Sequence, residues 1–272
     1  MGNSQEVTMI KIVLSIIVLY VVVLLLFYCL QRSLIYFPSS YAAPTPQAAG
    51  VGQMQMVSLH TDDGLTLNAW YHPPKEPYKP TIVYFHGNAG HIGNRAIIIM
   101  PFLTKGYGVL LVTYRGYSGN PGKPSEKGFY QDARAALQFL KAKGVPLSSL
   151  VLYGESIGTA VAIQMATEYH IGALVLQAPF TSLTDIGQYH YPIFPIRWML
   201  KDTFTCLEKA KNVHVPVLIL HGENDNIIPP SMSRPLFEAF PGPKKALYIP
   251  NRGHNDLYEP LQVIQFIESH NI

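Results

Sequence analysis

Six short runs of apolar residues, rich in valine, isoleucine and leucine, alternate with segments of helical periodicity along most of the chain. Because these runs do not alternate between apolar and polar residues, we expect strands that are buried on both faces. Strands that alternate with helices predict an α/β fold, with a mostly parallel sheet and helices on both faces. In such sheets the functional site lies at the carboxyl ends of the strands. The expected strands cover residues 81–85, 109–114, 150–153, 173–176, 217–220 and 246–249.

The remaining patterns predict an antiparallel hairpin before this alternation and five helices within it. Residues 55–60 and 65–71 flank an Asp-Gly turn, which is typical of a two-stranded hairpin. The helix over 128–143 has a clear apolar face and ends just before a glycine. The other expected helices cover residues 95–103, 157–169, 231–240 and 260–270.

An uncharged apolar run covers residues 12–30, between Lys11 and Arg32. As a helix it would be about 28 Å long, close to the ~30 Å hydrocarbon core of a bilayer. A buried core helix should show a polar face, and a cleaved signal peptide should have a shorter apolar run followed by a small-residue cleavage site. The run shows neither feature, so we expect an uncleaved transmembrane anchor.

The run divides the chain into four expected parts: a tail (1–11), the anchor (12–30), a linker (31–54) and one α/β domain (55–272). Within the linker, residues 38–52 are rich in Pro, Ala, Ser and Gly, which predicts a semi-extended connection. A chain that starts near Gln55 should therefore be soluble and active. Lys11 and the α-amino group on the short tail, against Arg32 alone on the other flank, favour a single-pass membrane protein with the domain on the non-cytoplasmic face.

Charge and cysteine content exclude some classes of partner. The net charge of +3 is mild and no stripe of Lys and Arg occurs, so we expect no nucleic-acid partner. The two cysteines, Cys29 and Cys206, lie far apart and are expected to be free thiols.

The segment Gly154-Glu155-Ser156-Ile157-Gly158 matches the nucleophile elbow G-x-S-x-G. An apolar run ends at the motif and a helical pattern begins after it, which is the strand, tight turn and helix that an exposed serine nucleophile requires. Ser156 is therefore the expected nucleophile, beside a helix amino terminus that favours an oxyanion.

A serine nucleophile requires a base, and the base requires an acid that orients it. In this architecture the chain order is serine, acid, histidine. Asp225 and His254 each follow a late strand, so we expect them to complete a catalytic triad. Glu223 is the nearest rival acid, and Asp256 is a plausible supporting residue.

The loop after the first parallel strand, HGNAGH (86–91), is expected to supply an oxyanion donor. The backbone N–H of Asn88 is the first choice and that of Ala89 the alternative, with the N–H of Ile157 as the second donor. His86 and His91 lack the acidic partner of a zinc helix motif, so we expect no metal and no other cofactor.

Residues 178–216 lie where a lid is usual, and the stretch is short enough to predict a small lid over a shallow acyl pocket. Its aromatic side chains either line this pocket or pack on the sheet. The candidate pocket residues are Tyr189, Tyr191, Phe194 and Trp198.

In order and spacing, six segments of the chain resemble the BEM46-like α/β-hydrolases, which include the α/β-hydrolase domain-containing 13 and 17 families: HGNAGHIGNR, TYRGYSGNPGKPSEKGFYQDA, LYGESIG, APFTSL, HGENDNIIPP and RGHND. The resemblance extends from about Gln55 to the end, and a hydrophobic amino-terminal anchor resembles the former family too. It implies the α/β-hydrolase fold, the triad positions and hydrolase activity. The 17-type relatives are depalmitoylating thioesterases with an amino-terminal cysteine cluster; here only Cys29 lies in that region, so their substrate is not carried over.

These features predict a membrane-anchored serine hydrolase that cleaves small-molecule or lipid acyl esters or thioesters through an acyl-enzyme. Three alternatives stay open: a membrane-tethered binding or scaffold protein on the same fold, a serine peptidase and an acyltransferase.

Overall fold

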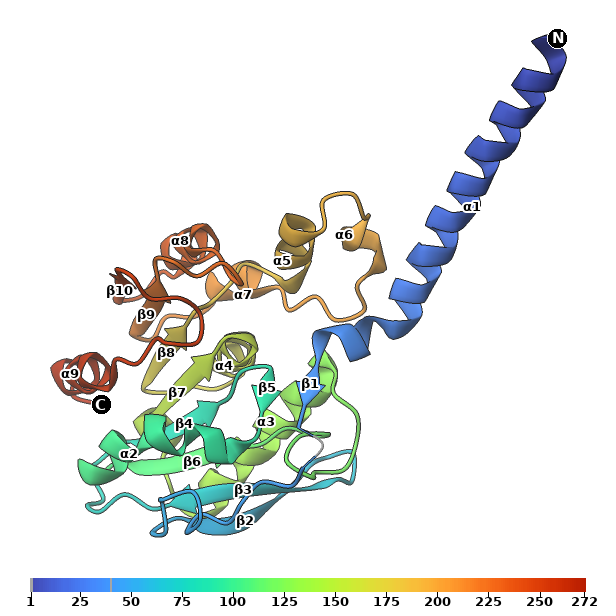
Figure 1. Ribbon diagram of the computed structural model, residues 1–272. Helices are drawn as coiled ribbons and strands as arrows, with labels where there is room; N and C mark the ends of the chain where they lie inside the picture. The colour runs from blue at the N-terminus through green and yellow to red at the C-terminus, as the bar shows by residue number, and fades with distance from the viewer. Residues whose placement is uncertain (1, 40) are drawn as a thin grey trace.

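The computed structural model describes residues 2–39 and 41–272, with the backbone alone for residues 2 and 3. Its centre is an eight-stranded sheet in the order β10-β9-β8-β7-β4-β6-β3-β2 (Figure 1). The β2–β3 and β3–β6 pairs are antiparallel, the first as the hairpin pattern predicts, and the other pairs in this sheet are parallel. The strands are β2 (Gln55–His60), β3 (Thr66–His72), β4 (Thr81–Phe85), β6 (Gly108–Val112), β7 (Leu150–Glu155), β8 (Ala173–Gln177), β9 (Val217–Gly222) and β10 (Lys244–Ile249).

Helices cover both faces of the sheet, which confirms the predicted α/β fold. On one face α3, α4, α7 and α8 contact one another in this order, and on the other face α2 packs against α9. The elements predicted from periodicity all form, within two residues of the expected bounds. The helices are α2 (Ala96–Thr104), α3 (Glu126–Ala142), α4 (Ile157–Glu168), α7 (Cys206–Ala210), α8 (Pro230–Ala239) and α9 (Pro260–Ser269), with short 3-10 helices over Ile92–Arg95 and Leu147–Ser149.

The central strands are buried over almost their whole length, because both faces of the sheet are covered. Every residue of β4, β6 and β8 is buried. Each buried Val, Leu or Ile side chain stabilises the fold by about 1.5–3 kcal/mol relative to exposure. The resulting rigidity fixes the loops at the carboxyl ends of β4, β7, β9 and β10.

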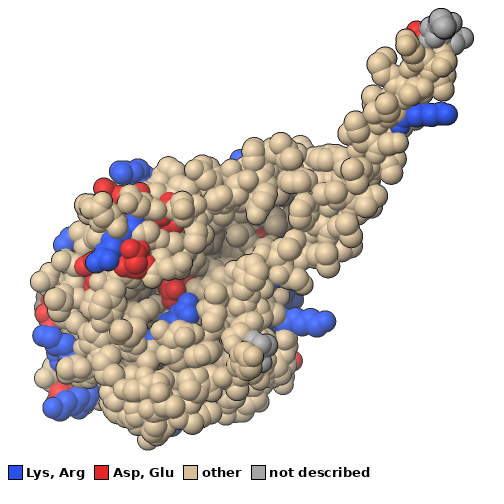
Figure 2. All heavy atoms as spheres, viewed as in Figure 1, with Lys and Arg blue, Asp and Glu red and all other residues tan. Residues whose placement is uncertain are grey.

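A small lid lies between β8 and β9, as expected. It carries the two short helices α5 (Leu183–His190) and α6 (Ile196–Met199). The lid reaches toward the amino-terminal helix α1 (Gly2–Ile35), which projects away from the domain (Figure 1). In Figure 2 the surface over the lid and the adjoining part of α1 is almost free of charged side chains on this face.

The segment after the apolar run differs from the expected linker. Helix α1 continues to Ile35, and β1 (Phe37–Pro38) then pairs in parallel with β5 (Ala89–Gly90) of the domain. Farther on, Val51 and Met54 are buried. The expected linker over 31–54, semi-extended over 38–52, therefore differs from these parts of the structure. The small residues and prolines form turns packed on the domain, which their composition equally allows.

Helix α1 is long and apolar enough to cross a bilayer over Ser4–Ile35, by length and composition. It also continues past Arg32, the charge that marked the end of the expected anchor.

Candidate active site

Ser156 occupies the turn between β7 and α4 with a φ of +52°, in a region that non-glycine residues rarely adopt. The two flanking glycines make this turn possible. A Cβ on Gly158 would lie 2.1 Å from the carbonyl oxygen of Phe85, and one on Gly154 would lie 2.5 Å from that of Gly158. The backbone N–H of Ser156 donates to the Gln177 carbonyl at 2.8 Å. The G-x-S-x-G spacing thus reflects close packing around a strained turn.

His254 and Asp225 are brought to Ser156 by the loops after β10 and β9. The distance from His254 Nε2 to Ser156 Oγ is 3.0 Å, and that from His254 Nδ1 to Asp225 Oδ2 is 2.7 Å. Both lie within hydrogen-bond range, so the imidazole can accept the serine proton at Nε2 while Nδ1–H donates to the carboxylate. The three residues expected as a triad therefore meet in space.

The Asp225 carboxylate is held from several sides. Its Oδ1 accepts the backbone N–H groups of Ile227 and Ile228 at 2.9 and 2.8 Å. The buried His221 ring lies 3.4 Å from Oδ2 and donates from Nε2 to the Ile228 carbonyl at 2.8 Å. Burial alone would raise the pKa of Asp225, but His221, His254 and the backbone N–H of Ile228 outweigh it and hold that pKa well below its usual range.

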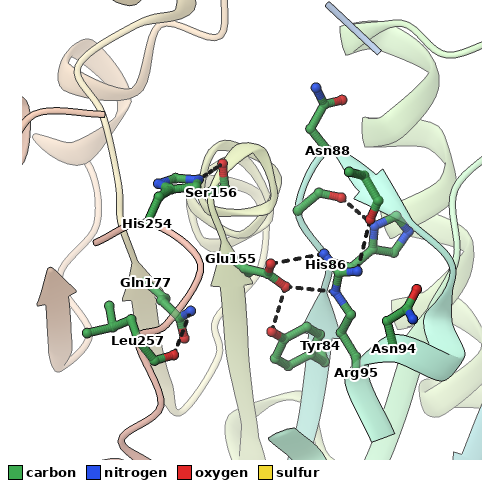
Figure 3. Close-up of polar contacts among 12 residues, drawn as sticks. Tyr84, His86, Asn88, Asn94, Arg95, Glu155, Ser156, Gln177, His254 and Leu257 are labelled. Carbon is green, nitrogen blue, oxygen red and sulfur yellow. Dashed lines mark hydrogen bonds and ion pairs between the residues drawn. The ribbon is translucent and has the colours of Figure 1, made fainter. Parts of the chain in front are cut away.

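The two other acids considered from the sequence lie differently. Glu223 is exposed, on the rim of the same loop. Asp256 accepts the backbone N–H of Gly253 at 2.6 Å and so shapes the turn that carries His254. Gln177 supports this loop from below, since its side-chain amide donates to the Leu257 carbonyl at 3.2 Å (Figure 3).

The expected oxyanion donors line the same cavity as Ser156. Ile157 is the first residue of α4, where backbone N–H groups have no partner within the helix. The Asn88 side chain is committed elsewhere: its amide donates to the Ile35 carbonyl, and its Oδ1 accepts from the Tyr117 hydroxyl at 3.0 Å. The backbone N–H of Asn88 is therefore the group that this residue can donate to an oxyanion. The alternative, Ala89, belongs to β5 and accepts Arg95 Nη1 at its carbonyl at 2.9 Å.

An ion pair that the sequence reasoning missed lies beside the elbow. Glu155, directly before Ser156, accepts two hydrogen bonds from Arg95 and one of 2.8 Å from the Tyr84 hydroxyl (Figure 3). Burial would raise the pKa of Glu155, but Arg95 and Tyr84 hold it below its ordinary value. Arg95 lies in the segment HGNAGHIGNR and Glu155 in the segment LYGESIG, both of which resemble the family. Their position in these two segments is the sequence feature from which the pair could have been predicted.

His86, considered from the sequence as a metal ligand, is a buried packing residue. Its Nδ1 donates to the Gly87 carbonyl at 2.6 Å, and its ring packs against Tyr114 and Tyr117. Burial is the main cause that lowers its pKa to about 4. The ring is therefore neutral at pH 7.

A cavity of about 800 Å³ opens above Ser156 and His254. This volume is in the upper part of the range for ligand pockets, so the site is not the shallow one expected. Of the four candidate aromatic residues, Tyr191 and Phe194 line the cavity, whereas Tyr189 and Trp198 lie exposed on the lid outside it.

One wall of the cavity comes from the amino-terminal segment, which the sequence reasoning treated only as an anchor. The wall consists of side chains from the end of α1 and from β1: Phe27, Gln31, Leu34, Ile35 and Phe37.

A family model and several relatives of known sequence match most of this chain. A family model described as serine aminopeptidase, S33, matches residues 76–201 and 192–260. An uncharacterized protein of Mycobacterium tuberculosis is 42% identical over 229 residues, covering 83% of this chain and 81% of its own. Protein bem46 of Schizosaccharomyces pombe is 32% identical over 250 residues, covering 84% and 81%.

Solved structures share the fold. The esterase Pf2001 of Pyrococcus furiosus matches with a TM-score of 0.69 at 19% identity, over 86% of this chain and 99% of the esterase. The esterase RhEst1 from Rhodococcus matches with a TM-score of 0.62 at 18% identity, over 80% and 98%. At these identities the likeness shows a common fold.

Proposed function

Since this chain belongs to the Bem46-like α/β-hydrolases of the serine aminopeptidase S33 family, we propose that it is a membrane-anchored serine hydrolase of carboxylic esters or thioesters. One observation carries the proposal: Ser156 Oγ, on a strained turn, lies 3.0 Å from His254 Nε2, and His254 Nδ1 lies 2.7 Å from Asp225 Oδ2. The presence of esterases among the structural neighbours, such as Pf2001, adds support.

The mechanism follows from these contacts. His254 Nε2 takes the proton of Ser156 as Oγ attacks the acyl carbonyl, and Asp225 stabilises the imidazolium that forms. The oxyanion is stabilised by the backbone N–H groups of Ile157 and Asn88, with Ala89 as the alternative. His254 then protonates the leaving group, which departs and leaves an acyl-enzyme. A water molecule activated by His254 releases the acid and restores Ser156.

The cavity favours an uncharged ester or thioester over a peptide with a free amino terminus. Recognition of an α-ammonium group requires a carboxylate that is free to pair with it. Among the described residues that line the cavity, the one carboxylate is Glu155, and Arg95 already pairs with it. The aminopeptidase in the family description is thus not favoured for this chain.

The anchoring part of the proposal rests on α1. Its long apolar surface is exposed from Val7 to Leu34, which is costly in water and favourable in a bilayer. Lys11 on the short tail favours a single pass with the domain on the non-cytoplasmic face. A non-catalytic scaffold would have no use for a strained serine within reach of a histidine that is held by a buried aspartate.

A fluorophosphonate probe tests the proposal on the full chain in detergent. Wild-type protein should be labelled at Ser156, and the Ser156→Ala variant should not be labelled although it folds. Ser182→Ala provides a matched control, since Ser182 caps α5 outside the cavity lining and labelling should persist. Failure of the wild type to react, or equal labelling of Ser156→Ala, would remove the hydrolase assignment.

A further inference from the structure

The second half of α1 is docked on the lid. The Tyr20 hydroxyl donates to the Ile193 carbonyl at 2.8 Å, and the rings of Phe27 and Phe194 meet edge to face at 5.1 Å between centroids. Tyr20 also stacks on Phe194 at 6.1 Å. The helix therefore contacts the tip of the lid along about two turns, rather than leaving the domain freely.

Polar contacts lock the end of α1 in place. Gln31 donates to the Met199 carbonyl at 3.1 Å and accepts the backbone N–H of Lys201 at 2.7 Å. Arg32 forms two hydrogen bonds, of 2.8 and 2.9 Å, with the buried Asp202 carboxylate. A bidentate pair with one buried partner fixes both position and rotation of the helix. α1 therefore presents one defined face to the lid and the cavity.

That face closes the space above the nucleophile. Phe27 and Leu34 of α1 line the same cavity as Ser156, and Phe194 and Ile196 of the lid line it from the other side. The side chains from α1 and the lid are mostly apolar, and the catalytic groups lie at the domain end of the cavity. An acyl chain attached at Ser156 could extend between α1 and the lid.

The same contacts fix the depth of the lid relative to a bilayer. Two charged side chains lie at the carboxyl-terminal end of the apolar run, Arg32 and Lys201. The Lys201 ammonium lies 4.3 Å from the centre of the Tyr28 ring. Tyr20 lies eight residues before Tyr28, which is about 12 Å along a helix axis. If the run spans the hydrocarbon, the lid tip that touches Tyr20 is immersed beside it.

The exposed residues of the lid fit this immersion. Ile193 is 74% and Trp198 is 87% exposed, and both are apolar side chains that water would disfavour. The charge nearest to them in sequence, Arg197, has a long side chain that can reach the headgroups. Trp and Tyr are enriched at membrane interfaces, and Tyr189 and Tyr191 are also exposed here.

From this arrangement, and resting on the proposed hydrolase function, we propose that the carboxyl-terminal end of α1 is a wall of the acyl-binding site, and that the substrate is a neutral long-chain ester that enters from the hydrocarbon between α1 and the lid. The anchor is then part of the active site. The route selects for chain length, because a long acyl group dissolves in the bilayer and fills the space between the two walls.

The electrostatics of the cavity favour a neutral substrate. Binding of a phosphate or another anionic head requires a cation that is free to pair. Among the described lining residues Arg95 carries the one permanent positive charge, and Glu155 already neutralises it. The other basic lining side chains are His254, which serves Ser156, and His190, whose Nε2 donates to the Ile227 carbonyl at 2.9 Å.

Two substitutions on α1 test the proposal in the full chain, reconstituted in phosphatidylcholine vesicles. Leu34 and Leu30 are one turn apart and equally exposed, at 51% and 52%, but only Leu34 lines the cavity. Leu34→Trp fills the wall and Leu30→Trp is its matched control. The substrates are 4-methylumbelliferyl oleate dissolved in the vesicles and water-soluble 4-methylumbelliferyl butyrate.

In Leu34→Trp the ratio of kcat/KM for oleate to that for butyrate should fall roughly tenfold or more. In Leu30→Trp the ratio should remain within about twofold of the wild type. An unchanged ratio in Leu34→Trp, or an equal fall in both variants, overturns the proposal. Butyrate hydrolysis by the wild type and its loss in Ser156→Ala report separately on the proposed function.

A second measurement avoids the risk that Leu34→Trp misfolds. A fluorophosphonate with a long alkyl chain that ends in a diazirine is attached to Ser156 of the wild-type protein in vesicles and then irradiated. The crosslinks should fall on residues 27–37 of the amino-terminal segment and on residues 183–200 of the lid. Crosslinks confined to the rim at 227–228 and 254–255, with none on the amino-terminal segment, would overturn the proposal.

Discussion

The guanidinium of Arg95 and the carboxylate of Glu155 face each other in parallel, with Nε–Oε2 and Nη2–Oε1 distances of 3.0 Å each. The same guanidinium donates from Nη1 to the Ala89 carbonyl. One side chain therefore ties the loop of the expected oxyanion donors to the residue directly before Ser156. In the proposed reaction we expect this pair to act by positioning, since both of its members are occupied with each other.

Glu155→Gln should lower the free energy of unfolding by about 3–5 kcal/mol, because it leaves the Arg95 charge without its partner in a largely buried place. It should also lower kcat more than it raises KM, since the nucleophile and the oxyanion donors lose their alignment. Urea unfolding and ester hydrolysis measure the two effects.

The control is another bidentate pair, Arg134–Glu168, which lies at the surface far from the site. Its side chains are 30% and 25% exposed, against 12% and 19% for Arg95 and Glu155. Glu168→Gln should cost about 1 kcal/mol or less and leave kcat unchanged. If Glu155→Gln and Glu168→Gln had equal effects on stability and kcat, the Arg95–Glu155 pair would have no role in positioning Ser156.

Asp225→Asn should lower kcat by about four orders of magnitude, because the amide cannot stabilise the imidazolium and favours the wrong tautomer of His254. Glu223→Gln, two residues earlier on the exposed rim, should change kcat by less than about tenfold. Steady-state hydrolysis of a butyrate ester by both variants measures this difference. If Glu223→Gln proved the more harmful, the acid of the triad would be Glu223.

The sheet and its covering helices could be predicted from the sequence because local periodicity determines them. A strand buried on both faces, such as β4 or β8, reads as a continuous apolar run whatever lies beside it. The G-x-S-x-G turn and the loops after β9 and β10 follow from the same reading, since strand ends in a parallel sheet meet at one edge. Ser156, Asp225 and His254 could thus be chosen without knowledge of their distances.

The role of the amino-terminal segment could not be predicted in this way. Its decisive contacts join residues far apart in the chain: Arg32 reaches Asp202, and Asn88 reaches the Ile35 carbonyl. No local pattern encodes such pairs. The proline- and alanine-rich composition after α1 is compatible with a free linker and with a segment packed on the domain. Only the tertiary contacts distinguish these two structures. The same holds for the lid, whose aromatic residues face the cavity, α1 or the outside.

A chain shortened to start at Gln55 should be unstable and inactive, contrary to what a free linker would allow. It lacks the buried side chains of Tyr36, Val51 and Met54, each of which contributes about 1.5–3 kcal/mol of burial. It also leaves the Asp202 carboxylate without Arg32. Thermal unfolding in detergent, compared with the full chain, measures the loss.

The matched control is a chain that starts at Tyr20. It keeps the contact of Tyr20 with Ile193 and every later contact of α1 with the lid. It should unfold at nearly the temperature of the full chain and hydrolyse butyrate esters. If the chain from Gln55 were equally stable and active, residues 20–54 would be dispensable for the site.

Stability should fall as the pH is lowered from about 6.5 to about 4, in part because of His86. Its pKa is about 4 in the buried site and about 6.5 in an unfolded chain, so in this window only the unfolded state takes up the proton. Each pH unit should then cost about 1.4 kcal/mol. His86→Phe, which keeps an aromatic ring against Tyr114 and Tyr117, should reduce the slope by about one proton.

Chemical unfolding at several pH values gives the slopes for both proteins. Asp132 acts in the opposite sense, since burial is the main cause that raises its pKa to about 6, but it is present in both proteins and cancels in the comparison. Identical slopes would mean that His86 is protonated as easily in the folded chain as in the unfolded chain.

The lid should lie within the lipid, and the two tryptophans of the chain allow a direct measurement. Trp198 is exposed on the lid, whereas Trp70 is buried in the domain. Phosphatidylcholine brominated on its acyl chains quenches only tryptophans that contact the hydrocarbon. The full chain in such vesicles should lose the Trp198 part of its fluorescence. Trp198→Phe should abolish the quenching, and Trp70→Phe should retain it.

Iodide in the aqueous phase provides the complementary measurement, since it quenches tryptophans that water can reach. Trp198 should be protected from iodide in vesicles but accessible once the protein is transferred to a short-chain detergent. The proposed route into the cavity requires this result, because Trp198 belongs to α6, and the lid can deliver a long-chain ester from the bilayer only if it is immersed. Strong iodide quenching in vesicles, without quenching by brominated lipid, would mean that the lid faces water and that the substrate reaches Ser156 from the aqueous side.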